Sequence, residues 1–343
     1  MRRLPLALGL LLMMAAIGLL LLGRIVWGGM HEPYKGYETE QFVEIPEGVH
    51  SREIGRQLIE RGVVRDAFVF RTALWWSARS RDLKAGEYRF AQPLSAIDVI
   101  DRIARGDVYV RKITFPEGLT IREMAAIYES RGFGSAAEFA RAAKEPRLIA
   151  DLDPQASDLE GYLFPETYAL PRGLPVGKLI PMMVDGFRAA YTDKLRRAAE
   201  TQGLTTRQVV TLAALVEKET GHEGERPLVA AVYRNRMKRG MPMQADPTLI
   251  YALQKAGRYD GNIRKADMAF DSPYNTYRNA GLPPGPIASP SKASLTAAIH
   301  PADVKYLYFV SRNDGTHVFA STLAEHNMNV RKYQVEYFRR QRR

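Results

Sequence analysis

The sequence of 343 residues contains no cysteine, which excludes disulfide bonds and a lipidated cysteine anchor. A chain of this length can bury a large core without disulfides. The sequence also lacks a Gly-x-Ser-x-Gly elbow, a phosphate-binding loop and a dinucleotide fingerprint. It has 6 histidines, and no second histidine follows His222-Glu223 at the spacing of a zinc site. We therefore predict that the protein uses no metal ion and no cofactor.

One long run without charge lies near the start of the chain, from Leu4 to Gly23. As a helix with a rise of about 1.5 Å per residue it crosses the ~30 Å hydrocarbon core of a bilayer, so we predict a transmembrane helix over residues 4–27. The run is too long for the apolar part of a signal peptide, and no Ala-x-Ala cleavage site follows it closely. Arg2 and Arg3 precede it, which leaves residues 1–3 in the cytoplasm.

This pattern predicts a single-pass protein of the cell inner membrane, with a polar linker at residues 28–40 and a periplasmic or otherwise extracytoplasmic remainder. Acidic residues are the minority among the charges: 49 Lys and Arg face 38 Asp and Glu, for a formal net charge of +11. Outside the cytoplasm such a surface suits anionic lipid headgroups or an anionic cell-wall polymer, so we predict no nucleic-acid partner. The Arg-rich end, residues 331–343, continues this basic bias, and a solvated helical tail explains it as well as a binding role does.

An internal repeat organises the first half of the chain. Ile45-Pro46-Glu47-Gly48 returns as Phe115-Pro116-Glu117-Gly118, seventy residues later, and Arg-Glu and Arg-Gly pairs follow each copy at the same offset. Two copies of one small unit are the simplest explanation. Each copy predicts a strand, a Pro-Glu-Gly turn and two helices. The predicted strands are residues 41–45, 88–90 and 110–115, and the helices are predicted to start near Ser51, Asp66, Thr120 and Ser135.

With its closing strand, the first copy resembles the LysM fold, a module that grips the N-acetylated sugars of peptidoglycan and chitin. We therefore predict a LysM-like βααβ module over residues 41–109, and a second repeat with a connecting region over residues 110–200. A purely structural repeat explains the same pattern, so glycan binding by the first copy stays open.

A predicted helix that begins at Thr206 carries an acid on its apolar face, with Thr205 as a cap and Gly221 as a stop. At about 100° per residue, Glu219 ends a stripe of bulky apolar side chains, whereas Glu217 lies about 160° away. Burial disfavours the charged form and raises a carboxyl pKa, as a general acid near neutral pH requires. Glu219 is the better candidate, although a solvent-facing last turn and a role for Glu217 remain alternatives. The stripe is formed by Val209, Leu212 and Val216.

The second half of the chain holds loops that are rich in aromatic, amide and hydroxyl groups and are stiffened by Gly and Pro. Such loops are typical of the wall of a carbohydrate cleft, because aromatic faces stack on sugar rings and amides bind sugar hydroxyls. The segments are Glu160–Tyr168, Gln244–Thr248, Tyr274–Tyr277, Gly281–Ile287 and Tyr306–Val310.

Together with Leu215–Thr220, the last four of these segments make the chain similar to the endolytic murein transglycosylases, the YceG-like or MltG-like family. The resemblance covers about residues 41–333. It implies an α+β fold with a single N-terminal transmembrane helix, LysM-like modules and a mixed α+β catalytic domain, here residues 201–343. It also implies a membrane-anchored lytic transglycosylase that cuts the MurNAc–GlcNAc β-1,4 bond within nascent glycan strands. Such cleavage leaves 1,6-anhydro-MurNAc ends and terminates glycan elongation.

The resemblance places the catalytic glutamate at Glu219, and it implies peptidoglycan glycan strands, the lipid bilayer and peptidoglycan synthases as partners. Two alternatives remain, a non-catalytic wall-binding scaffold and a muramidase-type hydrolase with a second acid such as Glu160 or Glu166. Glu166 stands where the family more often has Asp. Residue type and resemblance together give the substrate-binding candidates Gln244, Asp246, Asn275, Thr276, Tyr277 and Glu166.

Overall fold

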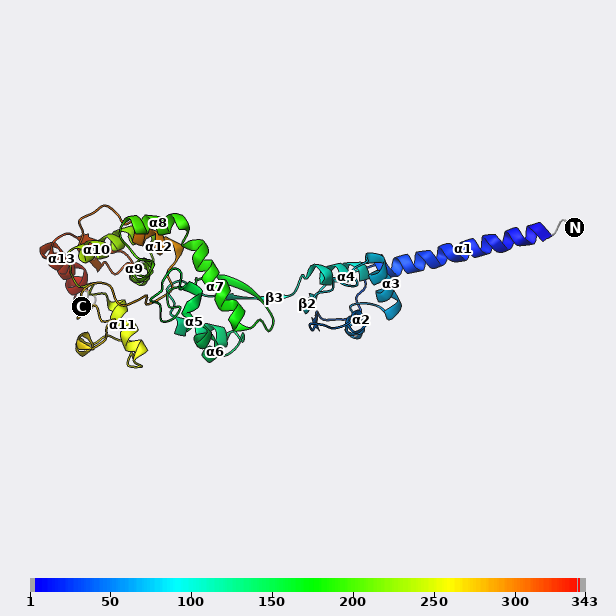
Figure 1. The fold of residues 1–343 in the computed structure, drawn as a ribbon, viewed down its shortest axis with the longest axis horizontal. Coiled ribbons are helices and arrows are strands. Elements are labelled where there is room, and N and C mark those ends of the chain that lie inside the picture. Colours follow the sequence, from blue (N-terminus) through cyan, green and yellow to red (C-terminus); the bar gives the residue numbers. More distant parts are fainter. Residues whose placement is uncertain (1–3, 338, 340–343) are drawn as a thin grey trace. The chain divides into compact units, whose positions relative to one another are not determined.

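The computed structural model describes residues 4–337 and 339; the predicted cytoplasmic residues 1–3 and residues 338 and 340–343 of the basic tail lie outside the described residues. The fold is mixed α+β, as predicted, with helices around three separate two-stranded sheets in the described part of the chain (Figure 1). The chain divides into two compact units. The first runs to Lys112 and includes Ala169–Gly173, and the second contains Ile113–Tyr168 and everything from Leu174 onward.

The first unit contains a long N-terminal helix and one copy of the repeat followed by a helix: α1 (Leu4–His31), β1 (Gln41–Ile45), α2 (Ser51–Glu60), α3 (Ala67–Ser77), β2 (Gly86–Phe90) and α4 (Ala96–Arg105). Strands β3 (Val110–Thr114) and β4 (Thr167–Pro171) pair with each other.

The second unit is mainly helical: α5 (Ile121–Ser130), α6 (Ala136–Ala142), α7 (Val176–Ala190), α8 (Asp193–Thr201), α9 (Thr206–Glu219), α10 (Arg226–Lys238), α11 (Asp246–Lys255), α12 (Lys292–Ile299), β5 (Tyr308–Ser311), β6 (His317–Ala320) and α13 (Leu323–Val330). Short 3₁₀ turns lie at Pro146–Ile149, Glu223–Glu225 and Lys265–Ala269, and a π-helical turn lies at Arg331–Glu336.

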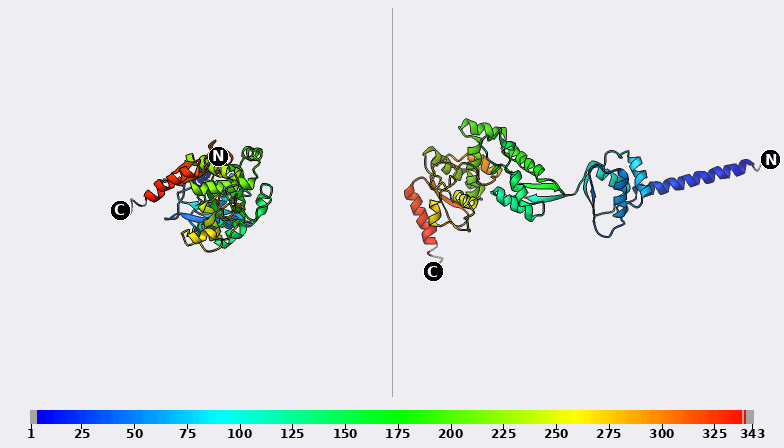
Figure 2. Two further views of the ribbon diagram at one scale, coloured as in Figure 1. Left: turned by 90° about the vertical axis from the view of Figure 1, so that its left-hand side faces the viewer. Right: turned by 60° about the horizontal axis from the view of Figure 1, so that its bottom comes forward.

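Helix α1 is long and apolar enough over Leu11–His31 to cross a membrane, with a mean hydropathy of 2.0. Its last turns, however, belong to the first unit (Figure 2). Met30 is buried in the core of that unit, and Trp27 meets Trp76 edge-to-face at 5.6 Å. The predicted linker at residues 28–40 therefore differs from the structure, because its first residues continue the helix and contribute to the core. An apolar residue reads the same in sequence whether lipid or protein covers it.

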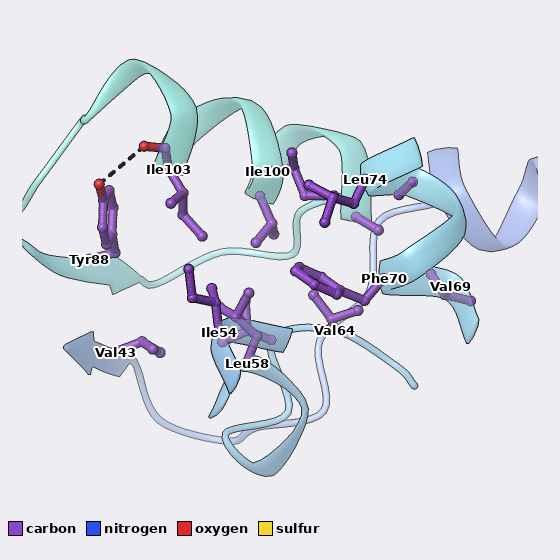
Figure 3. Close-up of a cluster of buried hydrophobic side chains, with 14 of the residues drawn as sticks. Val43, Ile54, Leu58, Val64, Val69, Phe70, Leu74, Tyr88, Ile100 and Ile103 are labelled. Atoms are coloured by element: carbon purple, nitrogen blue, oxygen red, sulfur yellow. Dashed lines mark hydrogen bonds between the residues drawn. The ribbon is translucent and has the colours of Figure 1, made fainter. Parts of the chain in front are cut away.

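The first repeat builds a small core between the β1–β2 pair and the three helices that follow β1 (Figure 3). The strands are antiparallel, with Gln41 opposite Phe90, so Val43 and Tyr88 face inward together. The hydroxyl of Tyr88 donates to the carbonyl of Ile103 at 3.2 Å, which satisfies the one polar group of this buried ring. The predicted strand–helix–helix–strand order is confirmed as a secondary-structure pattern.

The second copy repeats this order as β3, α5, α6 and β4. Gly48 and Gly118, the glycines of the two Pro-Glu-Gly turns, both adopt positive φ, 77° and 74°, a conformation that favours glycine. Helices α5 and α6 of this copy belong to the compact unit that contains α9, whereas parts of its strands, residues 110–112 and 169–171, belong to the first unit. The predicted boundaries at residues 109 and 200 therefore do not coincide with those of the compact units.

Helix α9 is the central element for the site. Thr205 caps it through a capping box with Gln208, as the sequence indicates, and the residues from Val209 to Val216 are all buried. The helix ends at Glu219, just before the predicted glycine stop, and Thr220 already has extended backbone angles. Helices α10, α11 and α12 pack against α9, so they surround its carboxyl-terminal acids.

Candidate active site

Glu219, the last residue of α9, is half-buried and bonded to a buried tyrosine. The hydroxyl of Tyr233, on α10, donates to its Oε1 at 2.6 Å. Burial raises the pKa of Glu219 to about 7, the hydrogen bond from Tyr233 opposes the rise, and the charge of Asp246 adds to it. A carboxyl group with this pKa exists in both protonation states near neutral pH, so it can donate a proton and recover it.

Arg236 lies one helical turn after Tyr233 and is also buried. Its Nε donates to the carbonyl of Leu307 at 2.7 Å and its Nη1 to the carbonyl of Met243 at 2.6 Å. The guanidinium thereby ties α10 to the segments before β5 and before α11. Its charge also acts on Glu219, where it lowers the pKa.

The predicted binding residues Asn275 and Thr276 are fully buried at the base of the site. The amide group of Asn275 donates to the carbonyls of Met268 and Phe270 at 3.1 and 2.8 Å, and its oxygen accepts from the Tyr277 backbone N–H at 3.0 Å. All of its polar atoms are thus engaged by backbone groups. This geometry favours positioning of Tyr277 over direct contact with a sugar.

Thr276 plays a comparable part for the segment that leads into α11. Its hydroxyl accepts from the backbone N–H of Ala245 at 3.1 Å and lies 2.8 Å from the hydroxyl of Thr248. Its carbonyl accepts from the backbone N–H of Gln244 at 3.2 Å. These bonds hold Gln244 at a positive φ of 50°, an uncommon conformation for a residue with a side chain.

The three remaining candidates on this side of the molecule are accessible. Gln244 and Asp246 are exposed, and Tyr277 is half-buried. The hydroxyl of Tyr277 donates to Asp246, and both residues are close enough to interact electrostatically with Glu219. The structure therefore brings Asp246 and Tyr277 close to the candidate acid, and Gln244 precedes Asp246 by two residues in the same segment.

Glu166 lies elsewhere in the second unit. Its side chain is exposed just before β4, and its carbonyl accepts from the backbone N–H of Phe115 at 3.0 Å. The groups that shift the pKa of Glu219 do not include it. A role for Glu166 in substrate binding stays a prediction.

Glu217 is buried as well, with 5% of its side chain exposed, but its partners are of another kind. It forms an ion pair with Arg226 at 3.2 Å and accepts from the backbone N–H of Ser291 at 2.7 Å. Glu217 thus joins α9 to α10 and to the start of α12. A buried carboxylate held by a cation and a backbone N–H is suited to stabilise the fold.

Sequence reasoning missed Tyr233, Arg236 and the pair formed by His317 and Glu225. The ring Nδ1 of His317 lies 2.8 Å from Glu225, and its backbone N–H donates to the same carboxylate at 2.8 Å. Although burial alone would raise it, the bonds from His317 hold the pKa of Glu225 below its usual range. The spacing of Tyr233 and Arg236 on one face of an apolar helix was the one available signal.

Glu160, the other candidate for a second acid, is buried in a different place. Its Oε1 accepts from the backbone N–H of Ile121 at 3.0 Å and its Oε2 from the hydroxyl of Tyr251 at 3.3 Å. Burial raises its pKa to about 8. It contributes to a cavity beside α5 and α6, not to the surroundings of Glu219. No group of three or more potential metal-ligating side chains occurs among the residues that the structure describes.

Known proteins are similar to this chain in sequence and in fold. The model of the YceG-like family matches residues 43–332. An endolytic murein transglycosylase of Bacillus subtilis is 30% identical over 315 residues, which cover 87% of this chain and 86% of that protein. One from Streptococcus pneumoniae strain D39 is 31% identical over 326 residues, 85% of this chain and 58% of that protein.

A crystal structure of a YceG-like protein from Listeria monocytogenes superposes with a TM-score of 0.56 at 29% identity. The match covers 85% of this chain and 100% of that one. The family model and these relatives show that the chain belongs to the YceG-like family.

Proposed function

We propose that the protein is a lytic transglycosylase that cuts peptidoglycan glycan strands internally, with Glu219 as its acid and base. The observation that carries the proposal is the half-buried carboxyl group with a pKa of about 7, held by Tyr233. The named activity of the Bacillus subtilis and Streptococcus pneumoniae relatives supports the same reaction for this chain.

One carboxyl group suffices for this reaction. An ordinary glycosidase uses two carboxyl groups, about 5–5.5 Å apart for retention or about 6.5–9.5 Å apart for inversion. In the lytic reaction the nucleophile is the C6 hydroxyl of the MurNAc residue itself. Glu219 donates its proton to the bridging oxygen as the glycosidic bond breaks. The carboxylate then takes the proton of the C6 hydroxyl as that oxygen bonds to C1 and closes the 1,6-anhydro ring.

The attacking hydroxyl is part of the sugar being cleaved, so its high effective concentration replaces that of an activated water. Tyr233 holds the carboxyl group in place through its hydrogen bond. Gln244, Asp246 and Tyr277 are the groups we assign to sugar binding, because all three are accessible and both Asp246 and Tyr277 interact with Glu219. Asn275 and Thr276 position them, and Glu166 is assigned to a more distant part of the strand.

Mass spectrometry of purified sacculi after digestion tests this proposal. We expect fragments that end in 1,6-anhydro-MurNAc and that come from cuts within the strand as well as near its ends, and none with the Glu219→Gln variant. Reducing MurNAc ends would contradict it in favour of a hydrolase. Binding to sacculi without any cleavage would contradict it in favour of a scaffold.

We also propose that α1 anchors the protein in the inner membrane as a single pass, with residues 1–3 in the cytoplasm and the two units outside it. The length and apolar character of Leu11–His31 support this. Because Met30 contributes to the core, a soluble variant should begin at Ile25 and keep the last turns of α1. It should remain in the supernatant and still cleave glycan strands, and sedimentation of this variant would contradict the anchor.

The first repeat is proposed to act as a LysM-like module that grips the glycan, and peptidoglycan synthases are proposed as neighbours of the enzyme in the membrane. The strand–helix–helix–strand order of the module supports the first proposal. Co-sedimentation with purified sacculi tests it. Loss of binding is expected when the loops flanking β1 and β2 are replaced, and unchanged binding would make the repeat a spacer.

A further inference from the structure

A cavity of about 530 Å³ lies in the second unit, between α5, α6 and the last turns of α11. Small apolar side chains form much of its wall, and Glu160 lies buried at one side. The cations Arg122, Lys144 and Lys255 stand at its rim and are exposed. The wall alanines are Ala125, Ala136, Ala137 and Ala140.

The first repeat has a cavity at the equivalent positions, with a volume of about 410 Å³, between α2 and α3. Its lining residues Ser51, Arg52, Gly55, Ala67, Phe70 and Leu74 correspond, seventy positions on, to Ile121, Arg122, Ala125, Ala137, Ala140 and Lys144. The hollow between the two helices is therefore a property of the repeated unit, and the two copies have filled it differently.

In the first copy an aromatic ring, that of Phe70, forms part of the cavity wall. A Cβ atom added to Gly55 would lie 2.5 Å from the ring of Phe70, so this ring requires glycine opposite it. In the second copy both positions are alanine, Ala125 and Ala140, and the ring is absent. The apolar Leu74 is also replaced, by Lys144. The second copy has thus gained space and a positive charge at the same place.

The charges around the second cavity favour an anion. Glu160 is largely uncharged at neutral pH, because burial raises its pKa to about 8. The other acid in the wall, Asp158, accepts from the backbone N–H of Glu160 at 3.0 Å and the hydroxyl of Ser157 at 3.3 Å. Lys255 lies over the rings of Tyr251 and Tyr274, 5.7 and 5.1 Å from their centres, which keeps its ammonium group beside the cavity.

We propose that this cavity binds a short peptide with small apolar side chains and a free terminal carboxylate, of the kind carried by peptidoglycan strands. Methyl-sized side chains match the alanine walls, and the carboxylate pairs with the rim cations, Lys255 first. The inference rests on the proposed function, since it assigns to the same enzyme a second contact with the same polymer.

Helix α11 connects the two places. Asp246 in its first turn acts on Glu219, and Lys255 in its last turn lines the cavity. At about 1.5 Å per residue, the nine steps between them span roughly 14 Å. A peptide attached to a sugar near the cleavage point is therefore within reach of the cavity, so the site selects where along a peptide-bearing strand the enzyme cuts.

Ligand-observed NMR titration of the full chain in detergent, with acetyl-D-Ala-D-Ala and its carboxamide as probes, tests the site. We expect saturable binding of the carboxylate and at least about tenfold weaker binding of the amide. The double variant Ala125→Gly/Ala140→Phe, which installs the glycine–phenylalanine pair of the first copy, should weaken binding, because the ring takes up part of the space between the alanines. Lys255→Met should weaken binding of the carboxylate alone. Equal binding of acid and amide, or unchanged binding in the double variant, would overturn the proposal.

A second measurement separates this inference from the proposed function. Strands with and without their peptides are cleaved by the wild type, and anhydro ends are counted. We expect a lower KM for peptide-bearing strands, and a smaller difference in the double variant. Equal KM values with normal formation of anhydro ends would overturn the peptide site and leave the transglycosylase intact. An absence of anhydro ends on both substrates would instead contradict the proposed function.

Discussion

Two acids at the end of α9 show how one helix can support both stability and chemistry. Glu217 and Glu219 are both withdrawn from water, yet Glu217 contacts a guanidinium and a backbone N–H, whereas Glu219 contacts a neutral phenol. Burial penalises the charged form of any carboxyl group, and a nearby cation offsets that penalty. The partners therefore distinguish the two acids: Glu217 is tied into an ion pair, whereas Glu219 has no cation as a direct partner among the described residues and its pKa is raised.

The two environments come from different parts of α10. Arg226, at its first position, reaches back to Glu217, and Tyr233, two turns further on, reaches Glu219. Arg236 completes the second environment, but it is bonded to backbone carbonyls and contributes only a longer-range charge. Exchange of function between the two acids is thus prevented by the register of α10 against α9.

The largest expected effect is on catalysis. Glu219→Gln keeps the shape and the contact with Tyr233 but cannot donate a proton, so cleavage of glycan strands should fall by about 10²–10⁴-fold or more. Glu217→Gln is the matched control. Assayed at a temperature at which this variant is folded, it should retain most of the turnover rate of the wild type. Release of anhydro-ended fragments over time measures both. Comparable losses in the two variants would remove the distinction between the acids.

The second effect concerns stability, and here the larger loss is expected for Glu217 and not for Glu219. Glu217→Gln leaves Arg226 buried with only the exposed Glu117, 3.6 Å away, as an ionic partner. Breaking a buried ion pair costs on the order of 3 kcal/mol, so the second unit should unfold at a clearly lower denaturant concentration. Urea unfolding followed by circular dichroism, with Glu53→Gln on the exposed surface of α2 as a control, measures this. A midpoint equal to that of the wild type would show that the pair is not stabilising.

The third effect is the pH dependence of cleavage. Glu219 must begin the reaction protonated, and its pKa is about 7. The rate should therefore be highest below pH 7 and fall towards tenfold per pH unit above it, as the carboxylate replaces the acid. Glu217→Gln should leave this limb where it is. A rate that is constant from pH 6 to 9 would argue against Glu219 as the general acid.

The fourth effect turns the raised pKa into a change of stability. A group that binds its proton more tightly in the folded state than in the unfolded state stabilises the fold while it is protonated. This stabilisation is lost as the pH rises from the pKa of the unfolded state through that of the folded state, which is about 7 for Glu219. Glu219→Gln removes the charge, so at pH 8 the variant should melt higher than the wild type, by roughly 2–4 °C for about 1 kcal/mol. At pH 4 the two should melt alike. A variant that melts lower at pH 8 would contradict this.

Sequence alone predicted what depends on local rules. The two repeats were visible because turn glycines with positive φ and helix caps are set by neighbouring residues, and Asp66 and Ser135 do cap α3 and α6. Glu219 followed from helical periodicity for the same reason. These features need no knowledge of what lies across the core.

The remaining features depend on contacts between distant segments. The choice of Tyr233 for Glu219 and of Arg226 for Glu217 is made by the packing of α10 on α9. Asn275 was interpreted as a sugar ligand from its amide, yet that amide is used by two backbone carbonyls of its own loop. Met30 belongs to the core of the first unit. Sequence does not predict this, because a helix that continues out of an apolar run carries no local signal of where the lipid ends.

The smallest expected effects are two opposite shifts of the falling limb of the pH–rate profile, the part above pH 7 where the rate decreases. Tyr233→Phe removes the hydrogen bond that lowers the pKa of Glu219, so the limb should move to higher pH. Asp246→Asn removes the negative charge that raises this pKa, so the limb should move to lower pH. Each shift should be a fraction of a pH unit, because burial, the first cause of the raised pKa, is unchanged in both variants.

Profiles of kcat/KM against pH for the two variants, measured in one buffer series at constant ionic strength, resolve the sign of these shifts. The position of the limb is independent of any loss of turnover that accompanies the removal of a sugar-binding or positioning group. Shifts in the same direction, or a limb that stays fixed in both variants, would mean that Glu219 is not the group that titrates. Opposite shifts would assign the limb to Glu219, because Tyr233 and Asp246 act on its pKa in opposite directions.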